Sequence, residues 1–205
     1  VYKRQALNGL GRYEEAMAAA DVALDATKGK SLNGHFQKGV AQNKLGQIEA
    51  SQASLNQVML LTEMNQNTAE RASNYALMAA MYDRQLGNSD SAMHYMNKAM
   101  AMDPANSNFV IEKGDMYVRS QQYDAAFEQY DKAVEMGRSD VEMYEIRANA
   151  RLKMLESKYQ TTKAKELKTK MTPAEKELVC TDLQTALEMG LKDMNKDMFA
   201  ALVCN

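Results

Sequence analysis

The residues most capable of catalysis or metal binding are few in this chain, and they do not cluster. Histidine occurs only at His35 and His94, and no His-x-x-x-His or Cys-x-x-Cys pair is present to begin a metal site. The neighbouring carboxylates Glu14 and Glu15 lie in an expected turn, where a solvated surface explains them better than acid–base chemistry. We therefore expect no catalytic residue, no metal site and no cofactor.

Sequence motifs for phosphate binding and for nucleophilic catalysis are absent as well. The chain contains no Gly-x-x-x-x-Gly-Lys loop, no Gly-x-Gly-x-x-Gly turn and no Gly-x-Ser-x-Gly elbow. The net charge of the chain is −2, whereas proteins that bind nucleic acid typically carry an excess of positive charge. No apolar stretch approaches the roughly 18 residues that a membrane span requires. We expect neither a nucleic-acid partner nor a membrane span.

The composition predicts helices throughout. Good helix formers dominate, with only two prolines and ten glycines, and Val, Ile and Thr never form an alternating run. Thr172-Pro173 followed by Glu175 predicts a capping box at the start of a late helix. The fold class is therefore expected to be all-α.

A short pattern recurs four times along the chain. A turn residue stands at positions 11, 46, 87 and 121, at intervals of 35, 41 and 34 residues, and each turn precedes an apolar helix. A period of about 34 residues with two helices per unit indicates a solenoid, in which neighbouring units share one core. The matching segments are Leu10–Ala16, Leu45–Ser51, Leu86–Ala92 and Ser120–Ala126.

This pattern resembles the tetratricopeptide repeat (TPR) family from Ala6 to Leu187. The family's small residue in the first helix corresponds to Gly39 and Gly114. The resemblance implies an α-solenoid of stacked antiparallel helix pairs, a right-handed superhelix with a C-terminal capping helix. One departure is visible: the first helix of the third repeat, ending at Tyr82–Leu86, is one residue too long, which predicts a local bulge. Other matching positions are the turn glycines Gly11, Gly46 and Gly87, the alanines Ala16, Ala23, Ala92, Ala99, Ala126 and Ala133, and Pro104.

The resemblance divides the chain into repeats. Residues 1–5 resemble the translation of a transposon-end sequencing adapter, so we expect them to be a non-native segment left by cloning or sequencing. The native sequence would then begin within a repeat. The alternative is that residues 1–5 are the genuine N-terminus. If these residues are non-native, any export signal and any earlier repeats that precede this segment in the natural protein would be missing from the sequence. The expected repeats are a partial first at 6–28, then 32–66, 73–106, 107–139 and 141–189, followed by a capping helix at 191–205.

The fifth repeat is interrupted by a Lys-rich insert at about residues 157–171. Its lysines outnumber its single acidic residue, Glu166, so it could contact an anionic partner; a solvated helical hairpin is the alternative. As a surface insertion it should be removable without unfolding the array. The lysines are Lys158, Lys163, Lys165, Lys168 and Lys170.

The resemblance also implies a partner-binding groove, because first helices line the concave surface of TPR arrays. We expect that its apolar members are not needed for the core within a repeat and that its asparagines pair with a peptide backbone. The corresponding positions are Asn33, Phe36, Val40 and Lys44 in the second repeat, Asn74, Leu77, Met78 and Met81 in the third, and Asn108, Ile111, Asp115 and Arg119 in the fourth.

The expected function is therefore a non-enzymatic protein–protein interaction scaffold. Its ligand would be a peptide or a partner helix held in the concave groove. The alternative is a regulatory or substrate-capturing module of a larger enzyme or cell-envelope complex whose remainder lies upstream. The two differ in what the complete reading frame encodes before this chain.

Cys180 and Cys204 lie on the two arms of the last expected helix pair. The arms extend 10 and 11 residues from a turn near Gly190–Asp193, so antiparallel helices would return both cysteines to the same end. The stretch also resembles the terminal repeat of some exported bacterial proteins of the family. We predict a disulfide that fastens the cap and favours an oxidising compartment such as the periplasm over the cytoplasm. Two buried cytosolic thiols are the alternative.

Overall fold

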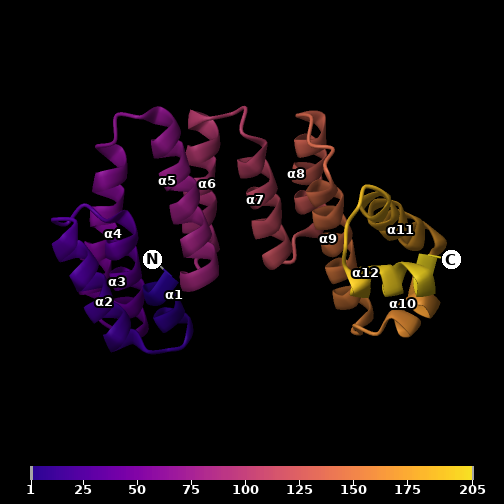
Figure 1. Ribbon diagram of the computed structural model, residues 1–205, viewed down its shortest axis with the longest axis horizontal. Helices are drawn as coiled ribbons and strands as arrows, with labels where there is room; N and C mark the ends of the chain where they lie inside the picture. Colours follow the sequence, from indigo (N-terminus) through magenta and orange to yellow (C-terminus); the bar gives the residue numbers. More distant parts are fainter. Residues whose placement is uncertain (1, 205) are drawn as a thin grey trace. The chain divides into compact units, whose positions relative to one another are not determined.

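The computed structural model describes residues 2–204, and every regular element within that range is a helix (Figure 1). This confirms the all-α prediction. The chain forms two compact units, residues 1–103 (unit 1) and 104–205 (unit 2), each with its own packed helices.

Unit 1 consists of three successive helix pairs, α1/α2, α3/α4 and α5/α6. Asparagine and serine side chains begin several of these helices: Ser31 accepts a hydrogen bond from the backbone N–H of Gly34, and Asn67 accepts from those of Ala69 and Glu70. Because Asn67 is such a cap, α5 begins earlier than the predicted repeat start at residue 73. The elements are α1 (Tyr2–Gly9), α2 (Tyr13–Ala26), α3 (Leu32–Lys44), α4 (Ile48–Glu63), α5 (Thr68–Met81), η1 (Tyr82–Leu86) and α6 (Ser89–Met102).

A π-helix ends the first helix of the third repeat. The segment η1 continues α5 without a break and closes at Gly87, whose φ of +65° suits glycine. A π-turn accommodates one residue more than an α-turn. The bulge predicted at Tyr82–Leu86 is thereby confirmed, and the extra residue changes which side chains of this segment face the neighbouring helices.

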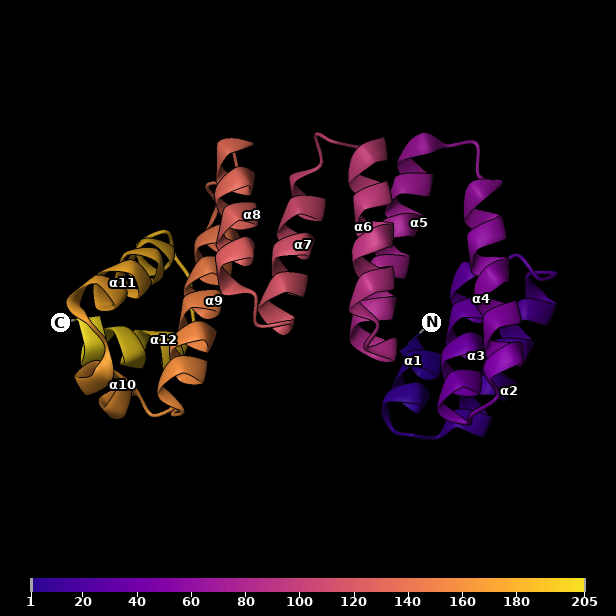
Figure 2. The ribbon, with the colours of Figure 1, turned by 180° about the vertical axis from the view of Figure 1, so that it is seen from behind.

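Unit 2 contains two helix pairs, α7/α8 and α9/α11, and Figures 1 and 2 show α9 and α11 side by side in both views. Helices α7 and α8 pack closely at Gly114, where an added Cβ would lie 2.5 Å from the Tyr130 ring. The elements are α7 (Ser107–Arg119), α8 (Tyr123–Glu135), α9 (Val141–Tyr159), α10 (Ala164–Lys170), α11 (Pro173–Glu188), α12 (Met194–Phe199) and η2 (Ala200–Cys204).

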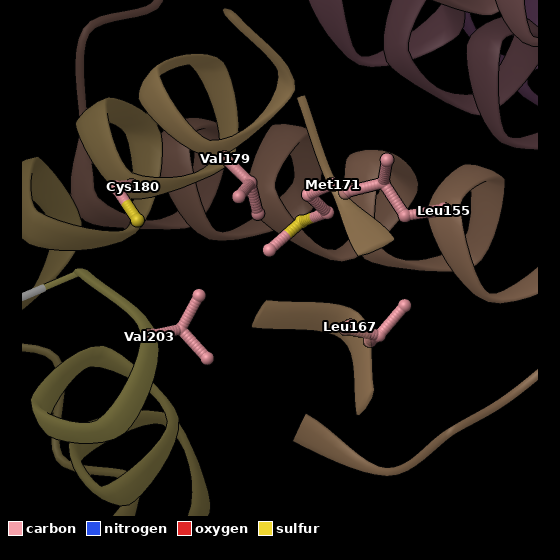
Figure 3. Packing of buried hydrophobic residues seen from close by; sticks show 6 residues of the cluster. All are labelled: Leu155, Leu167, Met171, Val179, Cys180 and Val203. Carbon is pink, nitrogen blue, oxygen red and sulfur yellow. The ribbon is translucent and has the colours of Figure 1, made fainter. Parts of the chain in front are cut away.

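The Lys-rich insert is part of a hydrophobic core. Leu167 of α10 is only 1% exposed, and Met171 is buried beside it. Figure 3 shows Leu167 and Val203 on one side of this core and Leu155, Met171 and Val179 on the other. The alternative of a fully solvated hairpin is therefore wrong, because the insert and the C-terminal segment together cover the ends of α9 and α11.

Most of the insert's lysines are also engaged within the chain. Lys158 contacts Glu175 at 2.7 Å, and Lys163 contacts Glu166 at 2.9 Å. The ammonium groups of Lys168 and Lys170 donate to backbone carbonyls. The two ion pairs offset the charge of Lys158 and Lys163, so less positive charge is left for an anionic partner than the sequence suggested.

The predicted capping box starts α11. The Thr172 hydroxyl accepts from the backbone N–H of Glu175, and the Glu175 carboxylate accepts in return from the backbone N–H of Thr172 at 2.8 Å. The ammonium of Lys158 and this N–H together lower the pKa of Glu175 to about 2.

Two findings concern membrane spans and metal sites. None of the helices between residues 2 and 204 is both long and apolar enough to cross a membrane. In the same range, no three His, Cys, Asp or Glu side chains are grouped so that they could hold a metal ion.

Candidate functional site

The structure corrects the composition of the predicted groove. Five of its six apolar members are buried: Phe36, Val40, Met78, Met81 and Ile111. Leu77 alone among the six is exposed, at 44%. These five apolar side chains are therefore not exposed on a binding surface, although the sequence assigned them to the groove.

Neighbouring repeats cover these side chains. The Phe36 ring packs edge-on against Tyr82 of η1, with ring centroids 6.0 Å apart. Met78 lies against α4, where the Thr62 hydroxyl is 3.9 Å from its sulfur. In a solenoid the core runs between repeats as well as within them, so an apolar first-helix position can be buried by the next repeat.

The polar members of the predicted set occupy varied surroundings. Asn33 accepts a hydrogen bond from Arg4 at 3.3 Å, and Asn108 accepts one from Arg138. These two amides are thus held by side chains of the same chain. Asn74 is half-buried, and Lys44 and Arg119 are exposed.

Two of the predicted residues, Asp115 and Arg119, meet at a concave site in unit 2. This "unit 2 hollow" has a volume of about 200 Å³ and lies between α7 and α9, above Tyr130 of α8. Side chains three and four residues apart share one helix face, and the lining residues follow that spacing on both helices. They are Asp115, Val118 and Arg119 on α7, Tyr130 on α8, and Ile146, Asn149, Ala150 and Lys153 on α9.

A buried hydrogen bond organises the floor of the unit 2 hollow. The Tyr130 hydroxyl donates to Oδ1 of Asp115 at 2.7 Å. Burial raises the pKa of Tyr130, and the Asp115 carboxylate raises it further, so the phenol remains a neutral donor at physiological pH. Arg119 also lies near Glu112, with 3.5 Å between Nη2 and Oε1. The arrangement suits binding through fixed polar groups.

Val40 and Lys44 contribute to a second concave site, within unit 1. This "unit 1 hollow" has a volume of about 380 Å³ and is formed by α1, α3 and η1. The π-helix supplies one wall, so the bulge noted in the sequence has a structural consequence at this site. The lining residues are Gln5, Asn8, Gly9, Val40, Lys44, Arg84 and Gln85.

Cys180 and Cys204 are joined by a disulfide, with their Cα atoms 5.5 Å apart. The bond connects α11 to η2 beside the core of Leu167 and Val203. Of the predicted site residues, the structure thus brings together the cysteine pair, the pair Asp115 and Arg119, and the pair Val40 and Lys44.

Sequence reasoning missed the residues that α9 contributes. Ile146, Asn149, Ala150 and Lys153 recur at the spacing of one helix face, and this signal was present in the sequence. Asn8 and Gln85 of the unit 1 hollow carry no comparable pattern.

Residues 77–141, from within α5 to the start of α9, match the family model described as tetratricopeptide repeat. This part of the chain is therefore similar to tetratricopeptide repeats, and its helices α7 and α8 form a pair. A comparison with curated proteins finds no match. Among solved structures, a tetratricopeptide repeat protein from Parabacteroides merdae ATCC 43184 superposes with a TM-score of 0.48 and 18% identity, covering 98% of this chain and 82% of that chain.

Proposed function

We propose that this protein is a non-enzymatic interaction scaffold whose unit 2 hollow binds an extended segment of a partner protein. TPR arrays present elongated binding surfaces rather than catalytic centres. The observation that carries the proposal is the unit 2 hollow itself, which combines apolar lining residues with the charged side chains of Asp115, Arg119 and Lys153.

The size of the unit 2 hollow favours a single side chain of a polypeptide. At about 200 Å³ it is smaller than the ~300–1,000 Å³ of ordinary small-molecule pockets. Val118, Ile146 and Ala150 provide apolar contact for one inserted side chain. The amide of half-buried Asn149 can both donate to and accept from the backbone of the inserted segment.

We test this proposal by selecting binders from a random peptide library displayed on phage. The full chain is the target, and Asn149→Trp, which fills the hollow from its rim, is the counter-target. We expect enriched peptides to carry one apolar residue and to lose at least tenfold in affinity for Asn149→Trp. Glu128→Trp, on an exposed position of α8 outside the hollow, is the matched control and should bind as the wild type does.

Equal binding to wild type and to Asn149→Trp, with both proteins folded by circular dichroism, would refute a role for this hollow. The second candidate function is a regulatory or substrate-capturing module of a larger enzyme or envelope complex. A catalytic domain encoded in the same reading frame would favour that function, and the binding site would then serve to recruit its substrate.

A further inference from the structure

Residues 194–204, which we call the cover, lie over an apolar core of unit 2. The cover consists of the six-residue helix α12 and the five-residue π-helix η2, and η2 packs against α10 and α11. Among the side chains that the structure describes in this segment, only Ala200 and Val203 are buried, at 9% and 0% exposure. Across the core from Val203 lie Met171 and Val179 (Figure 3). The cover therefore closes this core with two small side chains.

Apolar packing by itself holds the cover weakly. Met194 and Met198 of α12 are 76% and 64% exposed, so this helix contributes little to the core. Together α12 and η2 are shorter than the ~12–15 residues below which an isolated helix is marginal in water. Ordering each residue costs conformational entropy, and the burial of two small side chains offsets this cost only in part. Other constraints must keep the cover in place.

The disulfide supplies the constraint at the far end of the cover. The near end is connected to α11 by the backbone, and Lys196 of α12 forms an ion pair with Glu145 of α9. The far end is bonded through Cys204 to Cys180 of α11. Beside that bond, a lysine of α10 donates to the backbone oxygen of Leu202 at 2.6 Å. Cleavage of the S–S bond removes the covalent constraint at the far end, while the near end stays attached.

The two sulfurs differ in their access to an incoming thiol. Cys180 is 7% exposed, whereas Cys204 is half-buried, so a thiolate of a dithiol reductant attacks the sulfur of Cys204. A bond forms between the reductant and Cys204, and the bond to Cys180 breaks. The Cys180 sulfur leaves with the electron pair and takes up a proton. The second thiol of the reductant then displaces Cys204 as a thiol, and the reductant departs as a disulfide after giving up two electrons.

We propose that reduction of the bond between Cys180 and Cys204 by a dithiol releases the cover and exposes an apolar surface on α10 and α11. The residues that lose their cover are Leu167, Met171 and Val179. Helices α9 and α11 pack directly against each other, so this pair persists when the cover opens. The disulfide is then a switch that keeps the surface closed in the oxidised protein. This proposal does not rest on peptide binding at the unit 2 hollow.

Hydrogen exchange of the full chain, followed by mass spectrometry with and without millimolar dithiothreitol, tests the proposal. Reduction should raise the exchange rate of the η2 amides about 100-fold, which is the loop-closure effect of a cross-link between residues separated by 24 positions. The amides of α7 and α8 should keep their rates. Thiol labelling of the denatured protein verifies that both cysteines were reduced.

Three variants separate the bond from the packing of the cover. The double variant Cys180→Ser with Cys204→Ser should exchange like the reduced wild type, whether or not dithiothreitol is present. Val203→Ala removes the equivalent of two buried CH₂ groups from the cover and should raise η2 exchange about tenfold. Leu178→Ala, at a position of α11 that is 49% exposed, is the matched control and should leave the exchange of η2 unchanged.

Four outcomes would overturn the proposal. The first is a rise in η2 exchange of less than about tenfold in protein whose cysteines are both reduced, because the bond would then not control the cover. The second is equally fast exchange in α7, α8 and η2, since reduction would then unfold unit 2 as a whole. The others are a bond that millimolar dithiothreitol leaves intact in the folded protein, and equal η2 exchange in Val203→Ala and wild type. Each outcome is independent of peptide binding at the unit 2 hollow, which Asn149→Trp tests.

Discussion

Replacing Gly114 with alanine should destabilise unit 2, although alanine is the better helix former. The added Cβ would lie 2.5 Å from Cε1 and 2.9 Å from Cδ1 of the Tyr130 ring. Ordinary contact begins at 3.4 Å, so the ring or the helix must move by about 0.9 Å. Tyr130 is 1% exposed, and its hydroxyl is held by Asp115, which leaves little room for this movement.

The expected net cost follows from opposing contributions. Overpacking a well-packed site costs about 1–3 kcal/mol. Disturbing the hydrogen bond between Tyr130 and Asp115 adds about 1 kcal/mol. The higher helix propensity of alanine offsets about 1 kcal/mol. We therefore expect Gly114→Ala to lower the free energy of unfolding by about 2 kcal/mol.

Urea denaturation followed by circular dichroism at 222 nm measures this change. Gly9→Ala is the matched control, because an added Cβ at Gly9 meets nothing within 4 Å. In a Tyr130→Ala background the clash is absent, so Gly114→Ala should then be neutral or stabilising. The reasoning fails if Gly114→Ala costs no more than Gly9→Ala, or if its cost persists in the Tyr130→Ala background.

Five further substitutions test other parts of the structure. Cys204→Ser should cost about 3 kcal/mol, as expected when a cross-link between residues separated by 24 positions is lost, and reductant should lower the melting temperature of the wild type but not of the variant. Leu167→Ala should cost about 3 kcal/mol in chemical denaturation, whereas a solvated insert would make it neutral. The lowered pKa of Glu175 stabilises the folded state above pH 4.5 and loses this effect as the pH falls toward about 2, so the melting temperatures of wild type and Glu175→Gln should converge across that interval. Phe36→Ala should cost about 3–5 kcal/mol and Leu77→Ala less than about 0.5 kcal/mol; similar values in thermal unfolding would contradict the burial described for the first helices.

The sequence by itself determined the repeat and the turns that separate its helices. The period of about 34 residues, the turn glycines and the small residues at helix contacts depend on local conformation and on packing within one helix pair. Such features recur at fixed intervals and can be recognised without coordinates. The same regularity exposed the additional residue before Gly87, because a π-turn disturbs the spacing of the side chains around it.

Only the tertiary structure decided which helix faces remain open. Phe36 occupies a position that the repeat pattern assigns to the groove, yet Tyr82 of the next repeat covers it. Leu167 lies in a segment whose many lysines suggest exposure to solvent, yet it shares a core with Val203. These outcomes depend on contacts between segments far apart in the chain, and a local pattern contains no information about them.

The two hollows have the same origin. Each forms where first helices of adjacent repeats leave a space that their side chains do not fill, and its shape depends on the length and register of every helix around it. The π-helix directs Gln85 to one hollow, and the face of α9 completes the other with Asn149. The sequence specifies each helix separately, whereas the space between helices is a property of their packing.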